Sequence, residues 1–308
     1  MKEICWVLAG PTASGKTALS LRLAREHGCE IVCMDSMQIY RGMDIGTAKP
    51  TPEELTVAPH HMVDMVDPTD AYSVARYQQE AEACIRGIHR RGHRALLVGG
   101  TGLYLRALRH PMAMGDTTGD PTFRREMEAL AEQEGGREKL HDRLREIDPV
   151  SAERIHKNNT RRVIRALEVQ HLTGIPFSRQ PQLDAEPPFS YRVACLTMNR
   201  ETLYRRIELR VDQMIRDGLA DEVRRLLEQG VPASAQAMLG IGYKEMIPYV
   251  RGECTLEEAA AAIKLGTRHY AKRQLTWMRR EEDVLWVDGL ANDAYEQLER
   301  WYTEGEEA

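Results

Sequence analysis

Short apolar runs and helix-like patterns alternate over the first hundred residues. The apolar runs resemble strands that are covered on both faces, because polar residues do not alternate within them. The two longest intervening stretches carry apolar residues at helical spacing. The expected strands span residues 4–8, 30–34 and 95–98, with a weaker one at 61–66, and the expected helices span 17–27 and 72–91. This order predicts a doubly wound α/β core with a parallel sheet.

The pattern changes after about residue 112. From there to residue 190 nearly all signals are helical, at 121–134, 137–147 and 161–173, followed by a Pro- and Gln-rich connector. Strand character returns at 191–198 and again at 284–287, and the remaining segments are mostly helical. We therefore predict one core formed by residues 1–112 and 191–308, which is interrupted by a helical insertion at 113–190.

Composition narrows the class of protein. The chain has 308 residues, of which 42% are hydrophobic and 29% charged, and its net charge is −5. A chain with this many apolar residues can bury enough surface to fold. Its net negative charge argues against non-specific coating of nucleic acid, but it does not exclude a local basic patch that binds nucleic acid. No apolar run approaches the ~18 residues that are needed to cross a bilayer. The first residues do not have the pattern of a signal peptide. The six cysteines include no CxxC pair. We expect a cytoplasmic protein with reduced thiols, no membrane contact and, by default, a monomeric state.

The strongest motif follows the first strand. Its eight residues fit G-x-x-x-x-G-K-[ST] without a mismatch and precede the first helix, as the mechanism of a phosphate-binding loop requires. Backbone N–H groups of such a loop converge on an anion at a helix N-terminus, the lysine adds charge and the last hydroxyl can hold Mg²⁺. The loop residues are Gly10, Pro11, Thr12, Ala13, Ser14, Gly15, Lys16 and Thr17. A nucleotide and a bare diphosphate ester would both fit.

The companions of this loop leave two classes open. The N-K-x-D base reader of GTPases is absent, and the strand at 95–98 ends in Gly99-Gly100-Thr101 rather than in an acidic pair. Only the strand before Asp35 is followed directly by an acidic residue. Asp35 would therefore lie at the carboxyl edge of the sheet, where open α/β sheets bind their ligands. A small-molecule kinase and a transferase with a diphosphate leaving group both satisfy this arrangement.

At this point the sequence resembles a known family, the bacterial tRNA dimethylallyltransferases, also called tRNA isopentenyltransferases. The matching segments follow the family order over most of the chain. They are GPTASGKT at 10–17, DSMQIYRGMDIGTAKP at 35–50, HHMVD at 60–64, VGGTGLYL at 98–105, IHKNNTRRVIRALEV at 155–169, GYKE at 242–245 and AKRQLTWMR at 271–279. The resemblance implies a P-loop NTPase-like α/β core with a helical insertion.

The resemblance also implies a reaction and its donor site. Members transfer a dimethylallyl group from dimethylallyl diphosphate to N6 of adenosine 37 in tRNA. The phosphate loop and Arg210 would bind the diphosphate, with Mg²⁺ at Thr17. Asp35 matches the family's carboxylate and would act as the general base, and Thr101 matches its glycine-turn threonine and would also act in catalysis.

The remaining matches concern tRNA. The insertion would clamp the anticodon arm. Arg124 aligns with the family only loosely, and Arg268 and Lys272 are added because they lie on a basic helical stripe. The full set of predicted tRNA contacts is Asp35, Ser36, Met37, Gln38, Thr101, Arg124, Arg161, Arg162, Arg165, Gly242, Tyr243, Lys244, Arg268, Lys272 and Gln274.

Simpler interpretations compete with several of these assignments. Asp35 could serve only as a metal ligand, and an arginine run such as 161–165 is commonly a solvated helix face. His60-His61 lacks a third ligand at useful spacing, so we interpret the pair as structural, and we expect Trp277 and Trp286 in the core. A kinase reading would leave the KRQ segment without a role, and a non-catalytic RNA-binding protein would leave Lys16, Thr17 and Asp35 unexplained.

Overall fold

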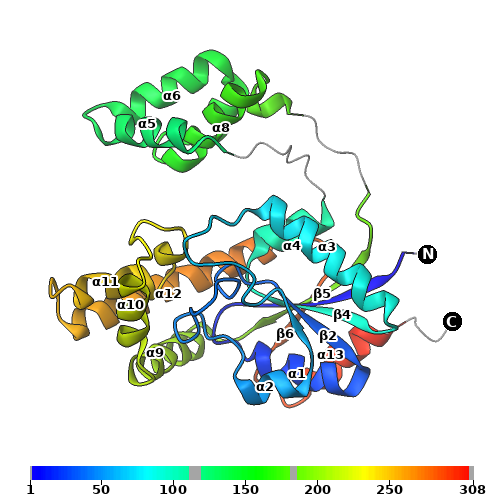
Figure 1. The fold of residues 1–308 in the computed structure, drawn as a ribbon. Helices are drawn as coiled ribbons and strands as arrows, with labels where there is room; N and C mark the ends of the chain where they lie inside the picture. Colours follow the sequence, from blue (N-terminus) through cyan, green and yellow to red (C-terminus); the bar gives the residue numbers. More distant parts are fainter. Residues whose placement is uncertain (1, 111–118, 181–185, 305–308) are drawn as a thin grey trace. The chain divides into compact units, whose positions relative to one another are not determined.

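The computed structural model describes residues 2–110, 119–180 and 186–304, and its chain divides into two compact units (Figure 1). One unit comprises Met1–His110 and Glu186–Ala308, and the other comprises Pro111–Ala185. The predicted boundary between residues 112 and 113 lies outside the described residues.

The larger unit contains a six-stranded sheet in the order β3-β2-β4-β1-β5-β6, and every strand pair is parallel. This confirms the predicted fold class. The strands are β1 (Ile4–Ala9), β2 (Cys29–Cys33), β3 (His60–His61), β4 (Arg94–Gly99), β5 (Ser190–Thr197) and β6 (Val284–Asp288). β1 lies inside the sheet between β4 and β5, which explains its uninterrupted apolar run.

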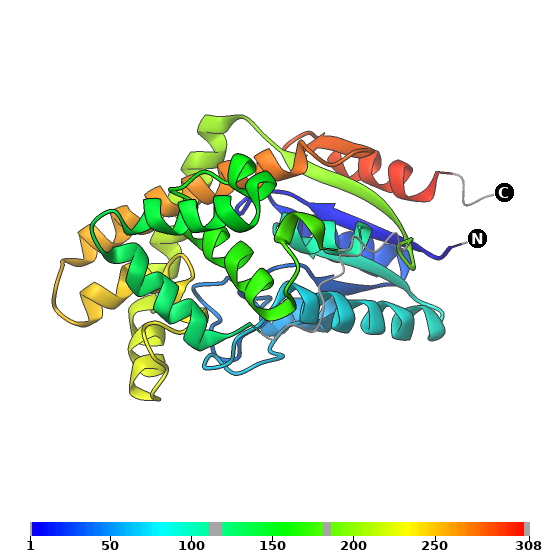
Figure 2. The ribbon, with the colours of Figure 1, turned by 90° about the horizontal axis from the view of Figure 1, so that it is seen from above.

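Alternate residues of β1 serve two different cores. Cys5 and Val7 pack on one face of the sheet, in the core that α3 (Val74–Arg90) and α4 (Gly102–Arg109) cover. Trp6 and Leu8 pack on the other face, under α1 (Lys16–His27) and α13 (Ala294–Thr303). Figures 1 and 2 show the resulting three layers, helix, sheet and helix. The strand period of two thus divides a continuous apolar run between two buried faces.

A second helical group lies beside the loops that follow the strands. It consists of α9 (Arg200–Arg216), α10 (Leu219–Glu228), α11 (Tyr243–Val250) and α12 (Leu256–Met278), with a 3₁₀ turn at Ala237–Leu239. Leu203 and Ile207 of α9 and Ala271 of α12 pack against Ala13 of the glycine-rich loop. This group therefore fixes the loop between β1 and α1 from the side opposite the sheet.

The smaller unit has a core of its own. It contains α5 (Pro121–Glu132), α6 (Gly136–Ile147), α7 (Pro149–Arg154), α8 (Thr160–Thr173) and a 3₁₀ turn at Phe177–Arg179. Phe123, Leu140, Leu144 and Leu167 are among its buried residues. Asp148 follows the last residue of α6 and caps α7 by accepting from the Ser151 N–H at 3.0 Å, so α6 ends at this Asp-Pro pair and a second helix begins there.

The structure differs from the expectations mainly in short elements. β3 has two residues where the pattern predicted a strand at 61–66, and the helices α2 (Pro52–Val57), α4, α7 and α11 were not predicted. Their length of six to eight residues gives little periodicity to detect. Trp286 was expected in the core but is 37% exposed, because β6 is an edge strand.

Candidate active site

A cavity of about 430 Å³ lies at the carboxyl ends of β1, β2 and β4. Its wall combines the glycine-rich loop with residues from several other segments of the larger unit. Lys16, Asp35, Gln38, Arg206, Arg210 and Gln274 are among the residues that line it. This is the edge at which open parallel sheets bind ligands, because loops from adjacent strands diverge there.

The loop has the backbone geometry of an anion site. Gly15 has a φ of 94°, in the left-handed region, and α1 begins directly after it. The Lys16 ammonium donates to the carbonyls of Gly10 and Pro11, at 2.9 and 2.7 Å, so it lies folded over the loop. Burial, followed by the nearby Arg210 charge, lowers the pKa of Lys16 to about 8. The site is therefore electropositive and short of counter-charge.

Two arginines of α9 face the same cavity. Arg206 donates from Nε to the Ala13 carbonyl at 2.8 Å, and Arg210 lies one helical turn further along α9. Burial lowers the pKa of Arg210, which remains a cation at neutral pH. Arg210 was predicted from the sequence, and Arg206 was not. The spacing of four residues in RRIELR could have indicated it, because residues i and i+4 share a helix face.

Asp35 and Thr101 belong to two backbone segments that are joined directly. The Met37 N–H donates to Asp35 Oδ1 at 2.9 Å, and the Ser36 N–H donates to Thr101 Oγ1 at 3.2 Å. A side chain at Gly99 would collide with the Met34 backbone, so glycine there permits the close approach. The two predicted catalytic residues are thus brought together at the sheet edge, with Asp35 in the wall of the cavity.

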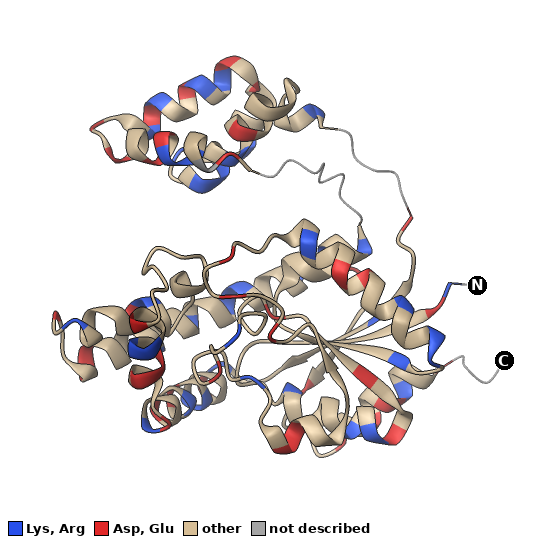
Figure 3. Ribbon diagram, viewed as in Figure 1, with Lys and Arg blue, Asp and Glu red and all other residues tan. Residues whose placement is uncertain are grey.

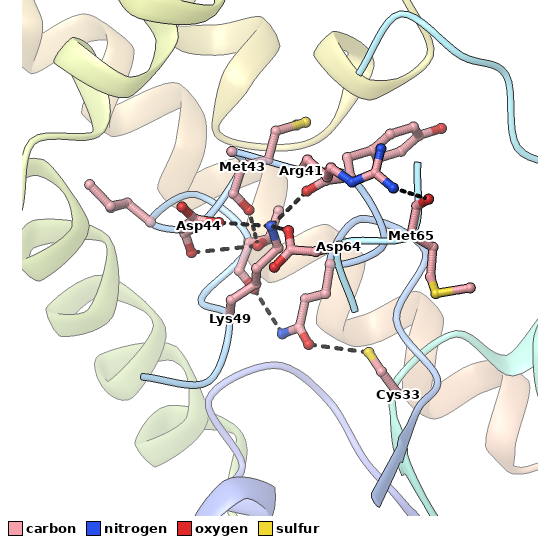
Figure 4. A network of polar contacts seen from close by, with 12 residues as sticks. Cys33, Arg41, Met43, Asp44, Lys49, Asp64 and Met65 are labelled. Atoms are coloured by element: carbon pink, nitrogen blue, oxygen red, sulfur yellow. Dashed lines mark hydrogen bonds and ion pairs between the residues drawn. The ribbon is translucent and has the colours of Figure 1, made fainter. Parts of the chain in front are cut away.

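Residues 37–50 form a loop that Lys49 holds from inside (Figure 4). The Lys49 side chain is only 5% exposed, and its ammonium donates to the Tyr40 carbonyl at 2.6 Å and contacts the carboxylates of Asp44 and Asp64. Gln38 donates to the carbonyls of Thr47 and Ala48 and accepts from Cys33 Sγ. The Gln38 amide is therefore already engaged within the protein.

A buried carboxylate anchors the other end of this loop. Glu222 of α10 is 2% exposed and accepts from the N–H groups of three consecutive residues, 44–46, at 2.9 to 3.1 Å. It also accepts from the Tyr243 hydroxyl at 2.6 Å. Because Tyr243 is fully buried in this contact, its side chain is not available to RNA. The sequence analysis did not identify Glu222, since nothing in α10 indicates a backbone partner 176 positions away.

The other predicted tRNA residues of the larger unit lie in different environments. Gln274 is buried in the cavity wall. Arg268 forms an ion pair with Glu208 at 3.1 Å, and Lys244 lies 3.5 Å from Glu245. Lys272 is exposed on the outer face of α12. It lines a shallow hollow together with His269, Arg273, Thr276, Trp277 and Arg280.

The arginines of the smaller unit that the resemblance assigned to tRNA fall into two groups. Arg124 and Arg165 both form ion pairs with Glu168, each at 2.6 Å, and that carboxylate is fully buried. Burial would raise the pKa of Glu168, but the hydrogen bonds from the two arginines outweigh burial and hold it below its ordinary value. Arg161 and Arg162 are exposed, and no ion pair involves them among the described residues. Figure 3 shows that positive and negative residues are interleaved along these helices.

Two further features bear on the kind of site. His60 contacts the Ala58 carbonyl and His61 the Glu30 carboxylate, and the described residues contain no group of three or more His, Cys, Asp or Glu side chains that could hold a metal. None of the described helices combines the length and hydropathy that crossing a membrane requires.

The fold and the loop define a protein of the P-loop class, with a phosphate-binding site at the carboxyl edge of a parallel sheet. Comparison with known families then identifies the family to which the chain belongs. Residues 38–281 match the IPP transferase family, and residues 3–64 match the isopentenyl transferase family. The chain belongs to the IPP transferase family, as the motifs predicted.

Curated relatives agree over nearly the whole chain. The tRNA dimethylallyltransferase of Shouchella clausii is 50% identical over 279 residues, which are 91% of this chain and 89% of that protein. The tRNA dimethylallyltransferase of Geobacter metallireducens is 50% identical over 284 residues, covering 92% and 91%.

Solved structures show the same fold. The full-length tRNA isopentenylpyrophosphate transferase of Bacillus halodurans has a TM-score of 0.71 and 44% identity, covering 97% of this chain and 94% of that one. A eukaryotic dimethylallyltransferase described as acting on tRNA has a TM-score of 0.76 and 29% identity, covering 99% and 77%.

Proposed function

We propose that this protein transfers a dimethylallyl group from dimethylallyl diphosphate to N6 of adenosine 37 in tRNA, in the cytoplasm and as a monomer. The observation that carries the proposal is that the phosphate loop and the acidic residue Asp35 line the same cavity. The chain is also about 50% identical to tRNA dimethylallyltransferases. A kinase would also need the loop, but these relatives are dimethylallyltransferases that are named for tRNA.

The residues of the cavity suit a substitution in which diphosphate leaves. The bond from the allylic carbon to the diphosphate oxygen breaks while N6 forms a bond to that carbon. Loop N–H groups, Lys16, Arg206 and Arg210 face the position at which negative charge develops, and such preorganised donors lower a barrier of this kind. The N6 proton passes to Asp35, because an amine conjugated with the purine ring needs a base as its new bond forms.

We infer that the site uses Mg²⁺. The Thr17 hydroxyl lines the cavity and is an oxygen donor of the type that Mg²⁺ prefers. The Cys33 thiol in the same wall is no competing ligand, because Mg²⁺ prefers oxygen to sulfur. When bound, the metal would supply charge neutralisation for the departing diphosphate.

For tRNA we propose two contact regions. The helical insertion at 113–190 clamps the anticodon arm through Arg161 and Arg162, which are exposed and have no ion-pair partner among the described residues. Lys272 on the outer face of α12 contacts the RNA backbone. The target base must leave its stack to reach the cavity, which costs less in a single-stranded loop than in a duplex.

One experiment tests the proposal directly. The protein is incubated with labelled dimethylallyl diphosphate, Mg²⁺ and unmodified tRNA, and the tRNA is digested to nucleosides. We expect the label on adenosine 37. A tRNA with guanosine at position 37 should receive no label. Label that stays in dimethylallyl diphosphate or its hydrolysis product dimethylallyl alcohol, with none in tRNA, would refute the proposed function. In a parallel incubation with γ-labelled ATP, transfer of label to a small molecule would favour the kinase.

A further inference from the structure

Helix α12 has an inner face that none of the roles above explains. Tyr270, Ala271 and Gln274 lie on that face, at the spacing of one helical turn. Ala271 is fully buried against the glycine-rich loop, and Gln274 is 4% exposed. The resemblance to the family assigned Gln274 to tRNA, but a side chain so enclosed has little surface to offer RNA.

Both ends of the Gln274 amide are engaged within the protein. Gln274 Oε1 accepts from the Thr12 N–H at 3.0 Å, and Nε2 donates to the Gly100 carbonyl at 3.1 Å. The orientation of the amide is unambiguous, because a backbone N–H can only donate and a carbonyl can only accept. One side chain thus joins the phosphate loop to the turn that leads to Thr101.

The surrounding backbone is shaped for this contact. A Cβ at Gly100 would fall on the Gln274 amide nitrogen, so only glycine leaves room for the amide. Beside it, the Tyr270 hydroxyl interacts with the side chains of Thr101 and Gln274. Thr101 in turn accepts from the Ser36 N–H, next to Asp35. Hydrogen bonds of Gln274 and Thr101 therefore link the loop that faces the diphosphate, through the backbone of Gly100 and Thr101, to the segment that carries the base.

We propose that Gln274 and Tyr270 are positioning residues, which hold the phosphate loop and the Thr101 turn at the separation that transfer requires. The proposal rests on the function proposed above. Its physical basis is that the electrophilic carbon is placed by the diphosphate while N6 is placed beside Asp35. A small change in the distance between the two supports therefore misaligns the reacting atoms, and a misplacement of about 1 Å can cost about 10²-fold in rate.

The test compares Gln274→Met, which removes both hydrogen bonds at nearly constant length, with Tyr270→Phe, which removes only a hydroxyl. Matched controls are Gln229→Met at the exposed end of α10 and Tyr249→Phe in α11. Single-turnover transfer is measured at saturating tRNA and donor, together with the Kd for tRNA. We expect Gln274→Met to lower the rate by about 10- to 100-fold and Tyr270→Phe by about 3- to 10-fold, with tRNA affinity within twofold of wild type.

A second variant separates this role from simple misfolding. Gly100→Ala disturbs the same bridge from the other side without altering α12, and it should reproduce the kinetic effect of Gln274→Met with an unchanged Kd for tRNA. Combining Tyr270→Phe with Thr101→Val should cost less than the product of the two single effects, because both changes remove one shared contact.

Amide hydrogen exchange gives a readout that does not depend on activity. The Thr12 amide should exchange faster in Gln274→Met than in the Gln229→Met control, since it loses its acceptor. A tRNA Kd raised tenfold with an unchanged saturated rate would overturn the proposal and make Gln274 an RNA contact. Unaltered Thr12 exchange would also overturn it. If wild-type protein transfers no label, the proposed function fails, whereas the exchange result still reports on the bridge.

Discussion

Arginines in the two units of this protein differ in whether a carboxylate neutralises them. Arg206 and Arg210 of the larger unit line a cavity in which positive charge accumulates around Lys16, and no ion pair engages them among the described residues. Arg124 and Arg165 of the smaller unit are held by the buried carboxylate of Glu168. Cations without a counter-charge create a site for an anion, whereas cations paired to a buried anion stabilise the fold. The same residue type therefore predicts function in one unit and structure in the other.

The largest expected effect concerns the base at the edge of the larger unit's cavity. Asp35→Asn keeps the shape of the side chain but cannot accept the N6 proton. Single-turnover transfer should fall by about 10²- to 10⁴-fold while the tRNA Kd stays close to wild type. A rate within threefold of wild type would show that Asp35 is not the base.

The comparison predicts next that Glu168 is structural. Glu168→Ala leaves two arginines without their partner, and breaking a buried ion pair costs about 3–5 kcal/mol. We expect a value near 3 kcal/mol, because Arg124 and Arg165 are 46% and 37% exposed and water screens them. Urea unfolding measures the loss. Glu153→Ala, on the exposed side of α7, is the matched control and should change the free energy of unfolding by less than about 0.5 kcal/mol.

Removing the unpaired arginines should affect the donor. Arg210→Ala is expected to raise the Kd for dimethylallyl diphosphate by about 10- to 100-fold, since a hydrogen bond to a charged group contributes about 1.5–3 kcal/mol. Arg205→Ala, an exposed neighbour on α9, should leave the Kd unchanged. Equal effects of the two variants in equilibrium binding would mean that general positive charge, rather than the cavity, binds the donor.

Within the smaller unit, the exposed and the paired arginines should behave differently. The double variant Arg161→Ala/Arg162→Ala is expected to reduce the salt dependence of tRNA binding by one to two phosphate contacts, about 0.7–0.9 each in the slope of log K against log salt. Its unfolding free energy should not change. If Arg124→Ala alters the slope as strongly, the paired arginines also contact RNA.

The smallest effect concerns pH. Because the pKa of Lys16 is lowered to about 8, the fraction of charged lysine declines as the pH rises through 8. Binding of the diphosphate needs the charged form, so the donor Kd should double at about pH 8 and increase about tenfold per unit well above it. Below pH 7 it should be flat. Calorimetric titration with the donor across pH 6.5–9 measures this dependence, and a Kd independent of pH would remove Lys16 from the donor site.

The sequence by itself determined the elements whose signals are local. Eight consecutive residues specify the phosphate loop, because turn, helix N-terminus and charge all lie within one segment. Apolar runs predicted β1, β2, β4, β5 and β6, and the family resemblance is confirmed by the comparisons. The sequence also placed Asp35 at the sheet edge, since a residue directly after a parallel strand lies there.

Only the tertiary structure decided which polar side chains are free and which are engaged. Glu222 binds backbone 176 positions away, Gln274 binds the loop 262 positions away, and Glu168 neutralises two arginines that the sequence suggested for RNA. The physical reason is that a charged or amide residue has no preferred partner in the unfolded chain. Its role depends on what burial places within about 3 Å, and helical spacing or composition does not encode that distance.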